Sequence, residues 1–347
     1  MKMKSKRFFD SFPPPTFLTM PAVGISVEAD ALRLAYFERS HNALVLKKHD
    51  TVAFERGAVT AGDITSSEKI TEALTILKQK HGVHFARFAL PEEKAYAYDT
   101  IIPVSETGDI ADAVEFSIDQ NIPLTAGEAV FDYAVLGDSF LNNDVRSVRV
   151  VVSAYPRALV DTWFELFAAA GITLVQAVSE SQAVAHAVVA HGDKRPRILV
   201  HFLKDKTIIA ITADGFIRFS TTVSGGVGGA IDDTHAQKVL DSHAGERISE
   251  SVELLAVRDE VKKVFAYWKS KENIRSRTEP RNIQELVVSG YVGDMADVAD
   301  YLGTHVGVSA HQANVWQNAF SLNDVVPDIH FEDSLPLAVV VGASLSE

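Results

Sequence analysis

The sequence contains no cysteine among its 347 residues. Disulfide bonds, thiolate metal sites and cysteine nucleophiles are therefore excluded, because each of them needs a thiol. The absence of disulfides is compatible with the reducing conditions of a cytoplasm. The histidines and acids also lack a recognisable ligand spacing, so we expect no metal site.

Long apolar runs are lacking as well. The longest candidates, such as residues 337–345, are about as long as a core element, whereas a helix that spans a bilayer needs roughly 20 apolar residues. The basic N-terminus, MKMKSKRFFDSFPPP, has no continuous apolar segment of the kind that a signal peptide carries. We therefore expect a protein that stays in the cytoplasm where it is made.

Positive charge is scarce. The chain has 33 lysines and arginines against 46 acids, which gives a formal net charge of −13 at pH 7. Such a charge repels phosphate backbones and anionic lipid, and so it argues against broad nucleic-acid binding. Residues 1–20 are a local exception, with basic side chains and phenylalanines before a run of prolines. They are either a weak membrane-surface or partner-binding arm, or a frayed tail.

Apolar periodicity predicts alternating strands and helices along the first half of the chain. We predict a meander of three strands at 22–28, 31–38 and 43–54. A helix at 66–82 and a further strand at 84–91 follow it. After these elements, a strand, an amphipathic helix, a strand pair and a second helix come in that order. We interpret this stretch as a β-α-β-β-α insertion.

The second half begins with the same meander again, at 197–226. When the halves are aligned at an offset of 175 residues, Ser26 falls on His201. Such a duplication predicts two like α/β units that face each other. We expect the first unit at 21–92 and 173–192, the insertion at 93–172, the second unit at 193–229 and 284–347, and a mainly helical subdomain at 230–283.

This plan resembles that of the superfamily of actin, heat-shock chaperones and sugar kinases, an α/β fold with two duplicated ribonuclease H-like domains. Within it, the order of segments resembles the type IV pilus assembly protein PilM family, which is related to the cell-division protein FtsA. The most distinctive stretches are NIPLTAGEAVFDYAVLG at 121–137 and VVVSAYPRALVDTWFELFAAAGITLVQAVSESQAVAHA at 150–187. The resemblance covers nearly the whole chain in collinear order. Its other stretches are VGISVEADALRLAYF, EVKKVFAYWKSKENI, ELVVSGYVGDMADVADYLGTHVGV and PLAVVVGASL.

The resemblance implies a cytoplasmic scaffold that is peripheral to the inner membrane. PilM-like proteins bind the short N-terminal peptide of a single-span partner, PilN, in a groove between the first unit and the insertion. They connect the membrane platform to the motor of the pilus machine, so that contact with the membrane is mainly indirect. Family members typically bind ATP in the cleft between the two halves.

Two turns would have to hold the phosphates of ATP, and glycine with bare backbone N–H groups suits such turns. The family usually has an aspartate followed two residues later by a glycine. This chain has Ser26 and Glu28 in the first turn and His201 and Leu203 in the second. A carboxylate at Glu28 would repel phosphate by on the order of 1 kcal/mol at short range. Lys204 is either a phosphate contact or a solvated turn residue.

Other residues of the cleft are partly kept. Glu180 lies where relatives position the attacking water or the water of the metal, and it reads equally well as an acid that stabilises the first turn of a helix. In the turn that would approach adenosine, Tyr291 replaces the middle glycine. The glycines that remain as candidate contacts are Gly225, Gly226, Gly290 and Gly293.

The sequence therefore predicts a pilus scaffold with a degenerate nucleotide cleft, no cofactor and no enzymatic activity. The alternative is a working ATPase or small-molecule kinase of the same superfamily, which would use ATP and Mg²⁺. A third interpretation is the cytoplasmic module of a type II secretion platform, although such modules normally carry a membrane span.

Overall fold

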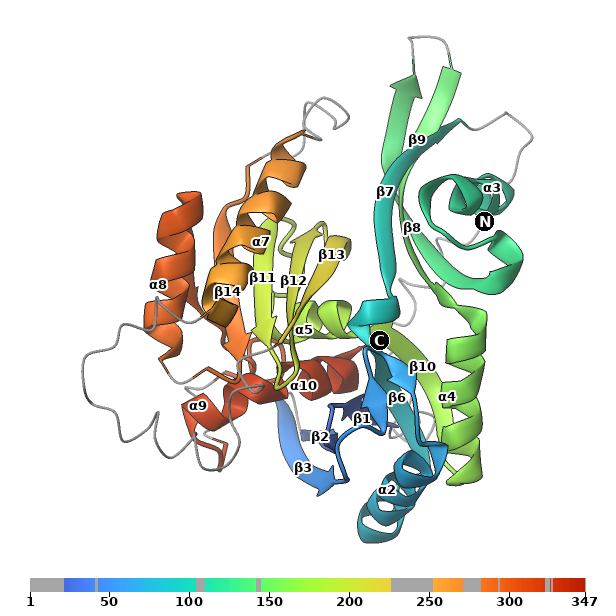
Figure 1. Cartoon of the computed structure of the whole chain (residues 1–347), viewed down its shortest axis with the longest axis vertical. Coiled ribbons are helices and arrows are strands. Elements are labelled where there is room, and N and C mark those ends of the chain that lie inside the picture. The colour runs from blue at the N-terminus through green and yellow to red at the C-terminus, as the bar shows by residue number, and fades with distance from the viewer. Residues whose placement is uncertain are drawn as a thin grey trace.

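The computed structural model describes most of the chain. The described residues are 22–40, 43–103, 110–141, 145–225, 252–270, 282–292, 294–321, 325 and 327–346. Within them, two five-stranded sheets form the bodies of two units, and a three-stranded sheet forms a third lobe (Figure 1). The expected basic tail at residues 1–20 lies outside the described residues.

The first sheet has the order β10-β6-β1-β2-β3. Its meander is antiparallel, whereas β6 and β10 run parallel to β1. All six residues of β1 are buried, Val23, Ile25 and Val27 among them, so both faces of this central strand are covered. The strands are β1 (Ala22–Val27), β2 (Ala31–Ser40), β3 (Ala43–Ala53), β6 (Phe85–Leu90) and β10 (Thr173–Ser179), and a short hairpin pairs β4 (Val59–Thr60) with β5 (Asp63–Ile64).

Two helices, α2 (Ser67–His81) and α4 (Arg157–Ala169), share one core with the first sheet. Helix α2 ends where Gly82 takes up a left-handed conformation, φ 65°. On α4, Trp163 is fully buried and its ring centroid lies 4.6 Å from that of Phe88 on β6. This contact places α4 in the core of the first unit.

The insertion is a three-stranded antiparallel sheet of order β7-β9-β8 with one helix on it. Its elements are β7 (Tyr96–Pro103), α3 (Ile110–Asn121), β8 (Ala129–Leu141) and β9 (Val145–Pro156), with short 3₁₀ turns η2 (Glu92–Lys94) and η3 (Ala126–Glu128) at its borders. The insertion predicted at 93–172 is therefore drawn too wide: its own core ends at Ala154, and α4 belongs to the first unit.

The second sheet repeats the first. Its order is β13-β12-β11-β14-β15, so that each strand matches one of the first sheet in the same sequence of connections. The elements are β11 (Arg197–Phe202), β12 (Lys206–Ala213), β13 (Phe216–Ser224), α7 (Val252–Ser270), β14 (Glu285–Gly290), α8 (Met295–Val306) and β15 (Ser309–Gln312). Of the helical subdomain predicted at 230–283, the structure describes mainly α7, whose buried side chains belong to the same core as the second sheet.

Two helices cross between the units, α5 (Glu180–Val188) and α10 (Ala338–Leu345). Gly342 of α10 lies against the backbone of Ala183 of α5, so closely that a Cβ on this glycine would meet the Ala183 carbonyl oxygen at 1.7 Å. Helix α10 is preceded by α9 (Phe331–Ser334) and the 3₁₀ turn η7 (Leu335–Leu337). Among the described residues, no helix combines the length and apolarity needed to cross a bilayer.

Candidate functional site

The two turns that the duplication matches lie opposite each other between the units. One turn joins β1 to β2, and in it the Glu28 N–H donates to the Ala31 carbonyl at 2.8 Å. The other joins β11 to β12, and in it the Leu203 N–H donates to the Lys206 carbonyl at 2.8 Å. Each turn thus follows the first strand of its unit, where the phosphate turns were predicted.

Glu28 points into a set of protein partners. Its side chain is almost fully buried and pairs with the Arg33 Nε at 2.5 Å, while the Tyr291 hydroxyl donates to its Oε2 at 2.9 Å. Arg33 also donates to the Tyr291 hydroxyl. Burial raises the pKa of Glu28, against the opposing charge of Arg33. The lone pairs of this carboxylate are therefore used within the protein.

Tyr291 crosses the gap between the units from the end of β14. Its ring lies 5.5 Å from the Arg33 guanidinium carbon and 5.6 Å from the Lys204 Nζ, distances at which a cation is attracted to the ring face. The preceding Gly290 has φ 108°, and a Cβ there would meet the Phe202 carbonyl oxygen at 2.0 Å. Gly290 is thus required by the backbone of β11, and Tyr291 occupies space that a glycine would leave open.

Lys204 lies in the second turn and reaches the first. Its Nζ contacts both carboxylate oxygens of Asp30, at 3.0 and 2.9 Å. The two side chains are about equally exposed, at 31% and 30%. Lys204 is therefore neither a free phosphate ligand nor a simply solvated turn residue, because an acid of the opposite unit already pairs with it.

His201 lies on β11 opposite Ser289 of β14, and its Nδ1 and the Ser289 Oγ are 2.8 Å apart. Burial, helped by the charges of Lys206 and Arg33, lowers the pKa of His201 to about 3, so that the ring is neutral at pH 7. Its Nε2 is buried without a partner among the described residues. The described part of the chain holds no group of three acids and histidines that could bind a metal ion.

Glu180 opens helix α5 and is also held by protein groups. Its Oε2 accepts from the Glu92 N–H at 2.9 Å and contacts the Lys206 Nζ at 2.7 Å. Lys206 pairs in addition with Glu93 at 2.5 Å. Burial, together with the negative charge of Glu93, raises the pKa of Glu180 to about 8 despite Lys206.

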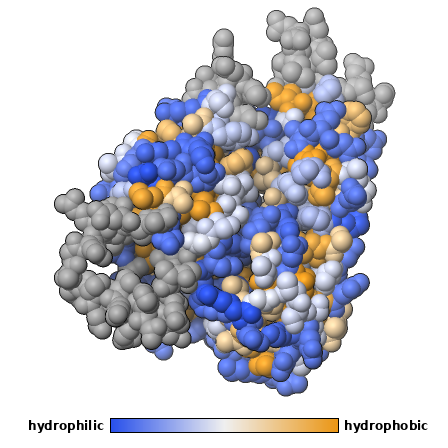
Figure 2. Space-filling view, in the orientation of Figure 1, coloured by the Kyte–Doolittle hydropathy of each residue, from blue (hydrophilic) through white to orange (hydrophobic). Residues whose placement is uncertain are grey.

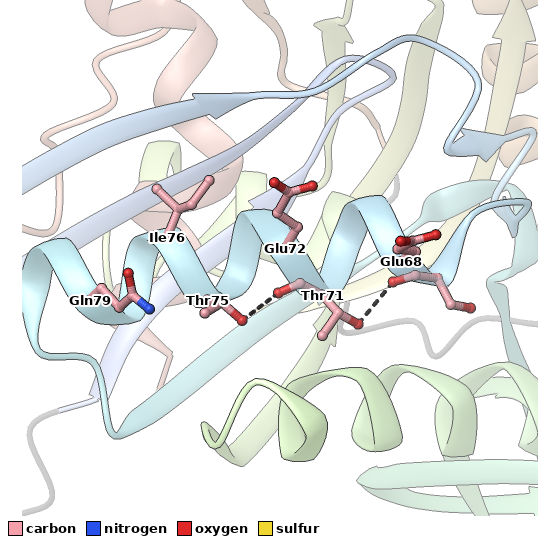
Figure 3. Close-up of a pocket in the computed structure, with 7 residues that line it drawn as sticks. Glu68, Thr71, Glu72, Thr75, Ile76 and Gln79 are labelled. Carbon is pink, nitrogen blue, oxygen red and sulfur yellow. Dashed lines mark hydrogen bonds between the residues drawn. The ribbon is translucent and has the colours of Figure 1, made fainter.

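Little open space remains between the turns. A cavity there, bordered by Glu28, Leu203 and Lys206, has a volume of about 10 Å³, about the space that one water molecule needs. A recess of about 600 Å³ lies elsewhere, on the outer face of α2 (Figure 3). Its described lining comes from that one helix, including Glu72 and the exposed Ile76, and a single convex helix face gives a ligand no enclosing wall.

Comparison with known proteins identifies the family. A model of the family described as type IV pilus assembly protein PilM matches residues 24–211, more than half of the chain. The chain belongs to this family. Membership links it to type IV pilus assembly and agrees with the resemblance that the sequence carries. No curated protein matches the chain.

Solved structures show the fold. A PilM–PilN type IV pilus biogenesis complex superposes with a TM-score of 0.74 at 17% identity, and covers 94% of this chain and 98% of the other. The ethanolamine utilization protein EutJ from Carboxydothermus hydrogenoformans gives 0.50 at 14% identity, over 95% and 91%. These matches confirm the actin-like fold that the PilM resemblance implied.

The PilM resemblance pointed to residues of both turns and missed the side chains that pair with them. Glu28 and Lys204 make contacts across the units, with Tyr291 and Asp30, whereas Ser26 and His201 are buried strand residues, and Ser26 is the cross-strand neighbour of Arg33. The sequence reasoning missed Arg33, Glu92, Glu93 and Lys206. Arg33 stands between buried Leu32 and Leu34, and this charge within an apolar strand was the available signal. Gly225 directly follows β13 with φ 83°, whereas Gly226 and Gly293 lie outside the described residues.

Proposed function

We propose that this PilM-family chain is a cytoplasmic scaffold of the type IV pilus inner-membrane platform. In this proposal it binds the N-terminal peptide of a PilN-like single-span protein, associates with the inner membrane mainly through that partner, and connects the platform to the motor proteins. Its nucleotide cleft is degenerate and it hydrolyses no ATP. The observation that carries the proposal is the network of Glu28, Arg33, Tyr291 and Lys204 in the space between the units.

The network supports a cleft without nucleotide on electrostatic grounds. A triphosphate seated against the turns would face the carboxylate of Glu28, and two like charges 4 Å apart repel by about 4 kcal/mol at an effective dielectric constant of 20. Freeing Arg33 or Lys204 to bind phosphate would leave a buried or half-buried acid unpaired, which costs further free energy. The cation that ATP brings with it would have no prepared group of ligands among the described residues.

The junction of α4 with the insertion is the surface that best suits an extended peptide. Arg157, the first residue of α4, donates to the Ala129 carbonyl at 2.8 Å and so fixes α4 to the start of β8. Nearby elements expose apolar side chains: Phe164 of α4 is 43% exposed and Val135 of β8 is 47% exposed. In the described sheets β8 is an edge strand, whose free backbone groups can pair with an added strand.

The surface pattern fits a short peptide better than a large partner. On the side of the molecule that Figure 2 presents, apolar side chains form small groups among hydrophilic ones, with no single broad apolar area. A short peptide needs only a few apolar contacts beside the hydrogen bonds of its backbone. We therefore place the docking region at the junction of α4 and β8.

Peptide binding is tested by calorimetry with the cytoplasmic N-terminal peptide of the PilN-like protein from the same organism. Wild type should bind it, and Phe164→Asp should weaken binding at least about tenfold, since burying a charge against the peptide is unfavourable. Phe216→Asp, at a residue of similar exposure on β13 in the second unit, is the matched control and should bind as wild type does. Absence of binding by wild type would refute the scaffold.

Nucleotide binding is tested separately, by titrating the chain with Mg-ATP. We expect no measurable heat and no phosphate release. Tight binding would refute the degenerate cleft but leave peptide capture standing, and turnover would favour the alternative of a working ATPase.

A further inference from the structure

We infer that Lys204, Lys206 and Tyr291 of the second unit form a latch with acids of the first unit, and that this latch fixes the two units in one closed arrangement without a nucleotide. The inference rests on the proposed absence of nucleotide from the cleft, and it adds how the units are held together instead. It concerns the angle between the units, not the pilus partner.

The latch has a point of attachment on either side of the β11–β12 turn. Lys204 pairs with Asp30 in the turn that follows β1. Two residues further along, Lys206 pairs with Glu93 of η2 at 2.5 Å and with Glu180 of α5 at 2.7 Å. Lys204 and Lys206 are thus bonded to three segments outside the second sheet: the turn that follows β1, η2 and α5.

A third point comes from β14. Tyr291 donates to Glu28 at 2.9 Å, and its ring lies against both Arg33 of the first unit and Lys204 of the second. Because Glu28 has only 3% of its side chain exposed, this hydrogen bond is shielded from water. The three points do not lie on one strand, so rotation of one unit against the other would have to break at least one of them.

The charges divide between the units in a way that suits this role. At the two lysine points the first unit supplies an acid, Asp30 or Glu93, and the second supplies the cation. In a nucleotide-binding relative, phosphate and its metal would stand between the same turns. Here the chain's own side chains neutralise each other directly, and so the closed arrangement is specified by the sequence and needs no ligand.

The latch predicts that the angle between the units does not respond to ATP. Because the chain has no cysteine, spin labels can be attached at two introduced sites alone. Gln79→Cys on α2 and Thr304→Cys on α8 place them on exposed positions of the first and second unit. Distances between the labels are then measured by double electron–electron resonance, with and without Mg-ATP.

Wild type bearing the labels should give one narrow distance distribution that Mg-ATP leaves unchanged. Lys204→Met and Tyr291→Gly, the second of which restores the glycine usual in the family, should each broaden the distribution at least about twofold. Lys47→Met is the matched control: it removes the exposed pair with Glu38, 3.7 Å apart within the first sheet, and should leave the distribution narrow. Lys206 is left intact, because its loss would strand buried acids and endanger folding.

A broad distribution in wild type, a shift on adding Mg-ATP, or variants as narrow as the Lys47 control would overturn the latch. Thermal melts confirm that each variant is folded. If Tyr291→Gly does not fold, the distance distribution of Lys204→Met alone tests the latch. A chain that keeps the narrow distribution but fails to bind the PilN-like peptide would refute the scaffold and leave the latch intact.

Discussion

The crossing of α5 and α10 should tolerate no side chain at Gly342. In Gly342→Ala the new Cβ would lie 1.7 Å from the Ala183 carbonyl oxygen, and contacts of a Cβ below 3.0 Å essentially never occur. The two helix backbones would therefore have to separate by about 1.3 Å. Overpacking a core costs about 1–3 kcal/mol, and because backbone has to move here we expect a loss of about 3 kcal/mol in the free energy of unfolding.

For a chain of 347 residues that loss corresponds to a fall of about 4 °C in the melting midpoint. Thermal and urea unfolding, followed by circular dichroism, measure both quantities. Gly127→Ala is the control, because a Cβ at Gly127 meets nothing within 4 Å, and its effect should stay within about 0.5 kcal/mol. If Gly342→Ala were as stable as this control, the close crossing of the two helices would not exist.

Three further predictions concern the core and the buried titrating groups. Trp163→Ala should cost about 3–5 kcal/mol in unfolding free energy, because it opens a large cavity. Phe164→Ala, at a residue 43% exposed on the same helix, should cost about 1 kcal/mol or less. Urea unfolding of the two variants measures both losses. Glu180 binds its proton more tightly in the folded protein, with a pKa of about 8 against 4.5. The free energy of unfolding should therefore fall as the pH rises from about 4.5 to about 8. Glu180→Gln should reduce this fall, measured by urea unfolding at several pH values in that range. Folding lowers the pKa of His201 from 6.5 to about 3. The free energy of unfolding should therefore also fall as the pH drops from about 6.5 to about 3. His201→Gln should lose less stability over this range, and a loss equal to that of wild type would contradict the prediction.

The repeated architecture was predictable because short local sequence patterns indicate its strands and helix ends. Apolar alternation located the meanders, and Gly82 marked the end of α2. Strand β10 was not predicted, because a bulge between Leu174 and Gln176 breaks its alternation. The amphipathic pattern of α4 was equally visible, but it does not say which sheet the helix covers.

The partners in the candidate site could not be predicted, because they meet only in three dimensions. Tyr291 and Glu28 are 263 residues apart in the sequence, and Lys204 and Asp30 are 174 apart. The family resemblance implied that the two turns lack the residues usual for holding phosphate. It did not show that Tyr291, read only as a lost glycine, would reach across to the opposite unit.

Helix α10 covers one face of the first sheet only late in synthesis of the chain. It packs on β1 and β2, and the Ser344 carbonyl accepts from Arg87 of β6 at 2.9 Å. The strands it covers leave the ribosome about 300 residues earlier than the helix itself. At about 5–20 residues per second, a nascent chain waits roughly 15–60 s with that face of its first sheet uncovered. Chaperones that shield apolar surface can therefore act on this face of the first sheet throughout that interval.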